Sequence, residues 1–187
     1  MDRDAIVHPS EVKGTWFVTL RSWGEQELGE SLESIAAEMP RYGELVAQSE
    51  QRDWYPEEAL HELFEVLFIR AGSPERFVEM SRSVSREGVG RFFRALLGLS
   101  SARFLLKQVP TMWGRLRRHD GAVVRVESHP DHSIVRYSNF PWFRYAVYRH
   151  FTLGSLSALA QLAEASAGKV GLVDHRDDAV TVRVEHP

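Results

Sequence analysis

The sequence predicts an α+β fold in which an N-terminal helical half precedes a β-β-α-β-β half with a four-stranded antiparallel sheet. Up to about residue 119, apolar residues recur at the three- and four-residue spacing of amphipathic helices. Beyond the turn residues Asp120-Gly121 the spacing falls to two, which is typical of strands. Residues 1–11 are expected to form a flexible arm and residues 12–187 a single domain. Its helical half covers 12–119 and its sheet half covers 120–187.

Start and stop residues indicate the helices of the first half. Pro56 suits the first turn of a helix, Gly72 and Gly98 suit helix ends, and Ser100-Ser101 can cap a further helix. The expected helices cover residues 14–26, 31–39, 56–71, 74–84 and 88–97, followed by two short ones within 101–109 and 110–116. Residues 41–53 are polar and show no clear period.

The second half alternates between strands and one long helix. Strands are expected over residues 122–128, 133–138, 169–174 and 179–184. Between the second and third strands, apolar residues at helical spacing predict a helix from Trp142 to about Ala167, ended by Gly168.

Composition excludes several classes of function. The 187 residues are 43% hydrophobic and 26% charged, with a net charge of −3, as in ordinary soluble globular proteins. The absence of cysteine excludes disulfides, thiol catalysis and thiolate metal sites. No secretory signal pattern opens the sequence, and no apolar run approaches the ~20 residues that span a bilayer. We therefore expect a cytoplasmic protein with no membrane association.

Charges are strongly segregated along the chain. Residues 1–80 carry 17 acidic and 7 basic residues, whereas residues 81–126 carry 2 acidic and 10 basic residues. Either these surfaces pair inside the fold, or the basic one meets an anionic partner. Because the chain is acidic overall, nucleic acid is a poor candidate, and an acidic or extended peptide or protein is the better one. Its expected anchors are Arg115, Arg117 and Arg118.

No group of residues predicts catalysis or a metal site. The sequence lacks a nucleophile elbow, a phosphate-binding loop and a dinucleotide-binding motif. His129 and His132 are the closest pair among the 8 histidines, but they lie in a predicted turn without further ligands nearby. His61 is expected at the surface. We expect no enzyme activity, no catalytic residues, no metal and no cofactor.

Several short motifs carry a resemblance that covers nearly the whole chain. They are Val12-Lys13-Gly14 before the first helix, Trp54-Tyr55-Pro56 opening a helix, Gly98 with the short helix after it, and Pro110 leading into the hinge. With this order of elements, the chain resembles the haem nitric oxide/oxygen-binding (H-NOX) domains and the related 4-vinyl-reductase-type ligand domains. It looks most similar to a bacterial paralogous family of unknown function with the same layout. The resemblance implies the scaffold of a ligand-binding module.

Two departures from the H-NOX pattern argue against its usual cofactor. Counting back from Gly121 to the position of the histidine that ligates haem iron in those domains reaches Met112. A single thioether without an imidazole partner is a weak iron site. The Tyr-x-Ser-x-Arg motif for the haem carboxylates is also absent, because the matching region begins Tyr137-Ser138-Asn139. The resemblance therefore implies a haem-free scaffold.

The same scaffold implies where a ligand would lie, between the helical half and the sheet. A possible small apolar ligand there would contact Met112, Trp113 and the start of the long helix, where Trp142, Tyr145 and His150 lie. Two functional hypotheses follow. The first is a non-enzymatic, regulatory or scaffolding module that binds a partner protein or peptide and is haem-free. The alternative is a small-molecule or haem-based sensor domain that uses this pocket. Neither hypothesis predicts an oligomeric state.

Overall fold

Short elements surround two longer helices in the first part of the structure. They are β1 (Glu11–Lys13), α1 (Thr15–Trp23), the π-helical turn η1 (Gly24–Leu28), α2 (Leu32–Ala36), α3 (Gly43–Ala47), β2 (Trp54–Pro56), α4 (Glu57–Ala71), α5 (Pro74–Phe93), α6 (Ala102–Lys107), α7 (Val109–Leu116) and β3 (Arg117–Arg118). The second part contains β4 (Val123–Ser128), β5 (His132–Ser138), the 3₁₀ turn η2 (Pro141–Arg144), α8 (Ala146–Ala163), β6 (Val170–Arg176) and β7 (Ala179–Glu185).

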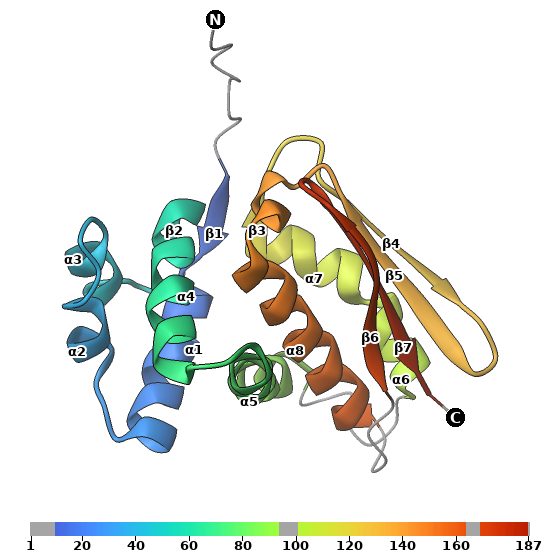
Figure 1. Ribbon diagram of the computed structural model, residues 1–187, viewed down its shortest axis with the longest axis horizontal. Helices are drawn as coiled ribbons and strands as arrows, with labels where there is room; N and C mark the ends of the chain where they lie inside the picture. The colour runs from blue at the N-terminus through green and yellow to red at the C-terminus, as the bar shows by residue number, and fades with distance from the viewer. Residues whose placement is uncertain (1–9, 94–100, 164–168, 187) are drawn as a thin grey trace, which may run out of the picture.

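The computed structural model describes residues 10–93, 101–163 and 169–186. Figure 1 shows a group of helices on one side and the antiparallel sheet on the other, with α7 and α8 between them. The predicted α+β class, with helices first and a four-stranded antiparallel sheet second, is confirmed. Of the predicted arm over residues 1–11, only the end is described, and there Ser10 is buried and Glu11 begins β1.

Local chemistry explains where several helices begin and end. The Ser31 hydroxyl accepts a hydrogen bond from the backbone N–H of Ser34 at 3.2 Å, which caps the start of α2. Ser101 caps α6 in the same way through the N–H of Phe104, at 3.3 Å, as predicted. Gly72 ends α4 at a φ of 74°, a left-handed conformation that glycine adopts without steric cost. The predicted helix ends at Gly98 and Gly168 lie outside the described residues.

A small three-stranded sheet, in the order β2-β1-β3, was not predicted. β1 pairs antiparallel with both neighbours, so Val12 is paired with Tyr55 on one side and with Arg117 on the other. Strands of two or three residues are too short to show a period of two, so Trp54-Tyr55-Pro56 was predicted to open a helix. These residues instead form β2, and α4 begins at Glu57. This small sheet brings the start of α4 close to the end of α7.

The four-stranded sheet has the order β4-β5-β7-β6 and is antiparallel throughout. Its inner face is buried, with Val135, Val180, Val182 and Val184 at most 1% exposed. All four strands match the predicted ranges to within two residues, and β5 and β7 alternate clearly between buried and more open positions.

The long helix was predicted to begin at Trp142, but α8 begins at Ala146. The four residues before it form η2, and Tyr145 is extended, with a φ of −86° and a ψ of 131°. The Arg149 guanidinium donates hydrogen bonds to the backbone carbonyls of Phe143 and Arg144, at 2.5 and 2.9 Å, which holds this turn against the helix. The start was therefore placed four residues too early. Aromatic spacing alone does not separate a 3₁₀ turn from the helix after it.

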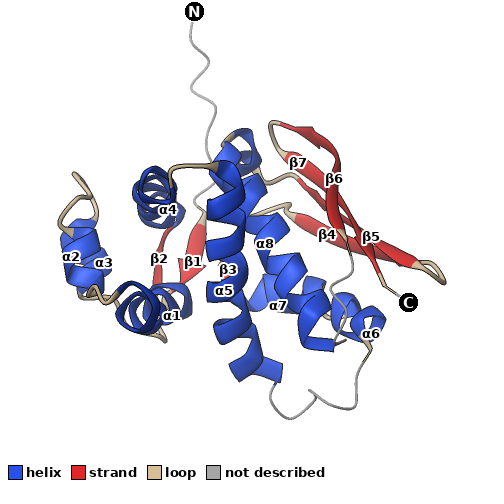
Figure 2. Ribbon diagram, turned by 60° about the horizontal axis from the view of Figure 1, so that its bottom comes forward, coloured by secondary structure: helices blue, strands red, loops and turns tan. Residues whose placement is uncertain are grey.

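α8 is the central helix of the fold. It packs along α5 on one side and against the sheet on the other (Figure 2). The approach to α5 depends on Gly154, because a Cβ there would lie 2.6 Å from the Cβ of Ser81 and 2.6 Å from the carbonyl oxygen of Val78. None of the described helices is long and apolar enough to cross a membrane.

Candidate functional site

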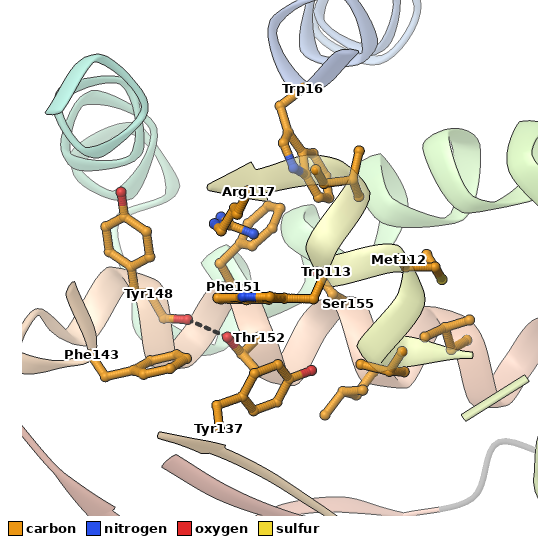
Figure 3. Close-up of a pocket in the computed structure, with 14 residues that line it drawn as sticks. Trp16, Met112, Trp113, Arg117, Tyr137, Phe143, Tyr148, Phe151, Thr152 and Ser155 are labelled. Carbon is orange, nitrogen blue, oxygen red and sulfur yellow. Dashed lines mark hydrogen bonds between the residues drawn. The ribbon is translucent and has the colours of Figure 1, made fainter. Parts of the chain in front are cut away.

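A pocket of about 70 Å³ lies in the middle of the fold, where α1, α7, β3, β5 and α8 meet (Figure 3). Its walls come from both halves of the chain and are mostly apolar or aromatic. The helical half contributes Trp16, Val109, Met112, Trp113, Leu116 and Arg117, and the sheet half contributes Tyr137, Phe143, Tyr148, Phe151, Thr152, Ser155, Leu156 and Leu159. A concave apolar site with few polar groups is the usual form of a small-molecule site.

Helical periodicity places the two longest walls of the pocket. On α7, the residues at positions 109, 112, 113 and 116 follow the i, i+3, i+4, i+7 pattern of one helix face. On α8, positions 148, 151, 152, 155 and 159 do the same over three turns. Two of the α8 polar groups are already satisfied. Thr152 donates to the backbone carbonyl of Tyr148 at 2.8 Å, and the Ser155 hydroxyl lies 2.8 Å from that of Ser85.

Among the described residues of the pocket wall, Arg117 is the one charged side chain, and it is only 7% exposed. Its Nε donates a hydrogen bond to Oε1 of Glu57 at 3.1 Å. The guanidinium lies over the ring of Trp113, with its carbon 4.6 Å from the ring centroid, and 6.0 Å from that of Trp16. This ion pair and these aromatic faces hold the cation inside the fold.

Glu57 is the counter-ion of Arg117, and it is fully buried at the first position of α4. Its Oε2 has no hydrogen-bond partner among the described residues. The Tyr148 hydroxyl donates to the backbone carbonyl of Glu57 at 3.2 Å, which links α8 to α4. Burial raises the pKa of the Glu57 carboxyl, and the interactions with Arg117 and Tyr148 only partly offset this effect.

Hydrogen-bond donors on three residues of the pocket lack an acceptor. The two terminal nitrogens of Arg117 and the hydroxyl of Tyr137 have no partner within the described part of the chain. The indole N–H of Trp16 is enclosed without one. Burial raises the pKa of the Tyr137 hydroxyl, so this group keeps its proton and stays a donor. Within the described wall, the unfilled hydrogen-bonding capacity is therefore on the donor side.

Comparison with known proteins places this geometry in a fold. No protein-family model matches the sequence, and no curated protein matches it. Among solved structures, the unliganded Fe(II) H-NOX protein from K. algicida superposes with a TM-score of 0.66 at 12% identity, over 94% of this chain and 97% of that one. The H-NOX protein from S. oneidensis, in its Fe(II)NO state, superposes with a TM-score of 0.65 at 13% identity, over 94% and 99%.

The chain has the H-NOX fold. The predicted resemblance to H-NOX domains is confirmed at the level of the scaffold. The closer resemblance to a bacterial paralogous family stays a prediction. At this level of identity the superposition shows the fold alone, so the chemistry of the pocket must be argued from its own residues.

Those residues do not fit an iron porphyrin held as a histidine-ligated haem. No histidine lines the pocket within the described residues, and Met112, at 8% exposure, is its one sulfur ligand. The pocket volume of about 70 Å³ is far below the ~300–1,000 Å³ of pockets that enclose drug-sized ligands. Elsewhere too, the described His, Asp and Glu side chains form no group of three that could hold a metal ion.

The structure brings together only part of the ligand site predicted from the sequence. Met112 and Trp113 both line the pocket. Trp142 and Tyr145 instead border a shallow pocket on the other side of η2, where both rings lie near that of His61. His150 is half-buried and stacks on Phe68, 6.1 Å between ring centroids, outside either pocket. For Trp142 and Tyr145 the shift follows from η2, because the turn before α8 places them at a different pocket from the one that α7 lines.

The three arginines predicted to anchor a partner differ in their burial and in their contacts. The expectation that Arg117 projects from the hinge is wrong, because the small sheet buries it against Glu57. Arg118 is exposed, but its guanidinium lies 3.6 Å from Glu11 and 3.8 Å above the ring of Trp54. Arg115 is exposed at the end of α7. For Arg117 and Arg118, the alternative in which the basic and acidic surfaces pair inside the fold is therefore confirmed.

Sequence reasoning missed Glu57, Trp16 and Tyr137 as residues of this site. One pattern could have revealed Glu57. Positions 57, 60, 64 and 67 follow helical spacing and the last three are apolar, so the glutamate is placed on the buried face of α4. An acidic residue on a buried face needs a buried partner, and the basic residues of the hinge were the candidates. No comparable pattern identifies Trp16 or Tyr137, since aromatic residues are ordinary core residues.

Proposed function

We propose that this protein is a non-enzymatic sensor domain that binds a small molecule, without haem, in the pocket between its helical half and its sheet. The observation that carries the proposal is the composition of the pocket wall. Trp16, α7 and Arg117 form one side, and Tyr137, η2 and α8 form the other. A molecule bound there contacts both halves at once, so its binding energy depends on how the halves are arranged.

The Arg117–Glu57 ion pair gives the pocket a mechanical connection to the helical half. Arg117 lines the pocket, and Glu57 begins α4, which also receives the Tyr148 hydrogen bond from α8. A ligand that moves the guanidinium therefore changes a contact that positions α4. Because a ligand can only shift an equilibrium by its differential affinity for the two states, the readout is the position or stability of α4.

Binding of a partner protein or peptide remains a prediction, and it has less support than binding of a small molecule. Of its three predicted anchors, Arg117 is buried and Arg118 is paired with Glu11 and Trp54. Exposed ion pairs of this kind contribute little to stability, so Arg118 could still exchange its partner. The pocket, by contrast, has donors that nothing within the described structure satisfies.

Binding of small apolar molecules can be tested by their effect on thermal unfolding and on the fluorescence of Trp16 and Trp113, which line the pocket. We expect members of a chemically varied set to raise the melting temperature of the native protein. Leu156→Phe fills the pocket from α8 and is expected to weaken binding about tenfold or more, since overpacking a filled site costs about 1–3 kcal/mol. Leu153→Phe is the matched control, on the same helix but outside the pocket. The proposal is contradicted if both variants bind these molecules equally well, or if none of the molecules binds the native protein.

Haem is tested separately by titrating the purified protein with haemin. We expect no one-to-one complex with a sharp Soret band, because the pocket wall offers a thioether and no imidazole. A sharp band at one-to-one stoichiometry that disappears in Met112→Ala would replace this proposal with a haem-based sensor.

A further inference from the structure

The unfilled donors of the pocket indicate what kind of molecule it takes. Arg117 is nine-tenths buried, and only its Nε is used, by Glu57. Its planar guanidinium carries further N–H donors in a fork that matches the geometry of a carboxylate. A ligand that supplies acceptors to these donors gains charge-assisted hydrogen bonds, which are stronger than those between neutral groups.

Other donors lie around the same ring. The ring centroid of Tyr137 is 5.1 Å from that of Trp113, and the guanidinium of Arg117 lies 4.6 Å from the Trp113 centroid on the helical side. The unpaired indole N–H of Trp16 belongs to the wall next to Arg117 (Figure 3). These groups come from α1, β3 and β5, elements far apart in the sequence, and Arg117 and Tyr137 lie on opposite faces of the Trp113 ring (Figure 3).

We infer that the ligand of this pocket is a short-chain carboxylate, with its carboxylate group at Arg117 and its apolar tail among the side chains of α7 and α8. This inference rests on the proposed function and specifies the ligand of the same pocket. A carboxylate offers about four lone-pair sites and can accept two parallel hydrogen bonds from a guanidinium. Val109, Leu156 and Leu159 offer apolar contact, and the hydroxyls of Thr152 and Ser155 are already hydrogen-bonded within the fold.

The size of the pocket limits the tail. At about 70 Å³ it is roughly half the volume of an engineered apolar cavity, about 150 Å³, that binds benzene. A chain of about three or four carbons fits that space, whereas a long fatty acid or a porphyrin does not. The single cation in the wall also disfavours a phosphate or a dicarboxylate, which would bring two charges to one guanidinium.

Glu57 sets how strongly the pocket attracts an anion. The groups around this carboxyl are the Arg117 guanidinium from β3, the Tyr148 hydroxyl from α8 and the neighbouring Glu58 carboxyl on α4. While Glu57 is ionised, it neutralises Arg117 and competes with the ligand. Glu57→Gln keeps the shape and an acceptor for Nε but removes the competing charge. The variant should therefore bind carboxylates more tightly than the native protein does.

The experiment compares butyrate with butyramide and 1-butanol, which have the same tail without the charge, by calorimetry on the full-length protein. We expect butyrate to bind at least about tenfold more tightly than either neutral analogue, since hydrogen bonds to a charged group contribute about 1.5–3 kcal/mol. Glu57→Gln is expected to tighten butyrate about tenfold and to leave butyramide unchanged, an increase that a misfolded variant cannot produce.

A second expectation concerns pH. Because Glu57 takes up a proton more readily than an exposed glutamate, butyrate affinity in the native protein should increase as pH falls toward the range where Glu57 is neutral. In Glu57→Gln, the affinity for butyrate should no longer rise as pH falls. The pH profile separates a competing charge from a purely structural role of Glu57.

Two results would overturn the inference and leave the proposed function intact. One is binding of the neutral analogues as tightly as butyrate, and the other is no increase in affinity in Glu57→Gln. If neither carboxylates nor any apolar molecule binds the native protein, the carboxylate inference and the proposed function both fail.

Discussion

Replacing Arg117 by methionine is expected to lower the free energy of unfolding by about 3–5 kcal/mol, because it leaves the fully buried Glu57 carboxylate without a counter-ion. The apolar stem of methionine keeps most of the contact with Trp113 and Trp16, so the loss reports the missing charge. Urea unfolding followed by circular dichroism measures it.

The double variant Arg117→Met with Glu57→Gln is the control for this result. With both charges removed, no uncompensated ion is buried, and most of the lost stability should return. The loss in Arg117→Met should also depend on pH. The raised pKa of Glu57 means that its stabilising contribution is present below the ordinary value of 4.5 and is lost as pH rises through the folded value. Removing Arg117 raises that pKa further, so the variant should be least stable relative to the native protein at neutral pH. Equal losses in the single and double variants would show that the ion pair is not what stabilises this region.

Gly154→Ala is expected to cost about 3 kcal/mol, at the upper end of the usual penalty for overpacking. The new methyl group would meet backbone as well as side chain, with the backbone nitrogen of Arg82 at 2.8 Å and the Val78 carbonyl oxygen at 2.6 Å. Backbone cannot rotate away as a flexible side chain can, so α5 and α8 must move apart.

Gly114→Ala on α7 is the matched control, because nothing lies within 4 Å of a Cβ there. Alanine has the better helix propensity, so this variant should gain up to about 1 kcal/mol. Thermal and urea unfolding of the two variants test the pair. A similar effect of both substitutions would show that the contact between α5 and α8 is looser than the structure indicates.

Periodicity predicted most of the second half of the fold. β5 and β7 alternate between buried and more open positions over seven residues, which is long enough for the pattern to be recognised. The turn before the strands was predicted from Asp120-Gly121, and Gly121 adopts a φ of 81°, a conformation that favours glycine. The start of α8 was misplaced because η2 carries aromatic residues at helical spacing, and a 3₁₀ turn leaves no separate mark on such a pattern.

The candidate site was predictable only in part, for a physical reason. Met112 and Trp113 could be placed in the pocket because the scaffold and the α7 periodicity both point there. Arg117 was recognised as a cation of the hinge, yet its direction depends on β3 pairing with β1, and a strand of two residues has no period to read.

By itself, the sequence determined the α+β order, the strands, the apolar face of α7 and the strong separation of charge along the chain, because each is a local pattern of residue types. Only the tertiary structure decided which charges meet. Glu57 and Arg117 are 60 positions apart, and their pairing arises because β1 joins β2 and β3 in one small sheet. Because of that pairing, Arg117, a cation expected at the surface, is the one charged group among the described residues of the pocket wall. Burial keeps Arg117 close to its counter-ion, and its remaining donors face the cavity.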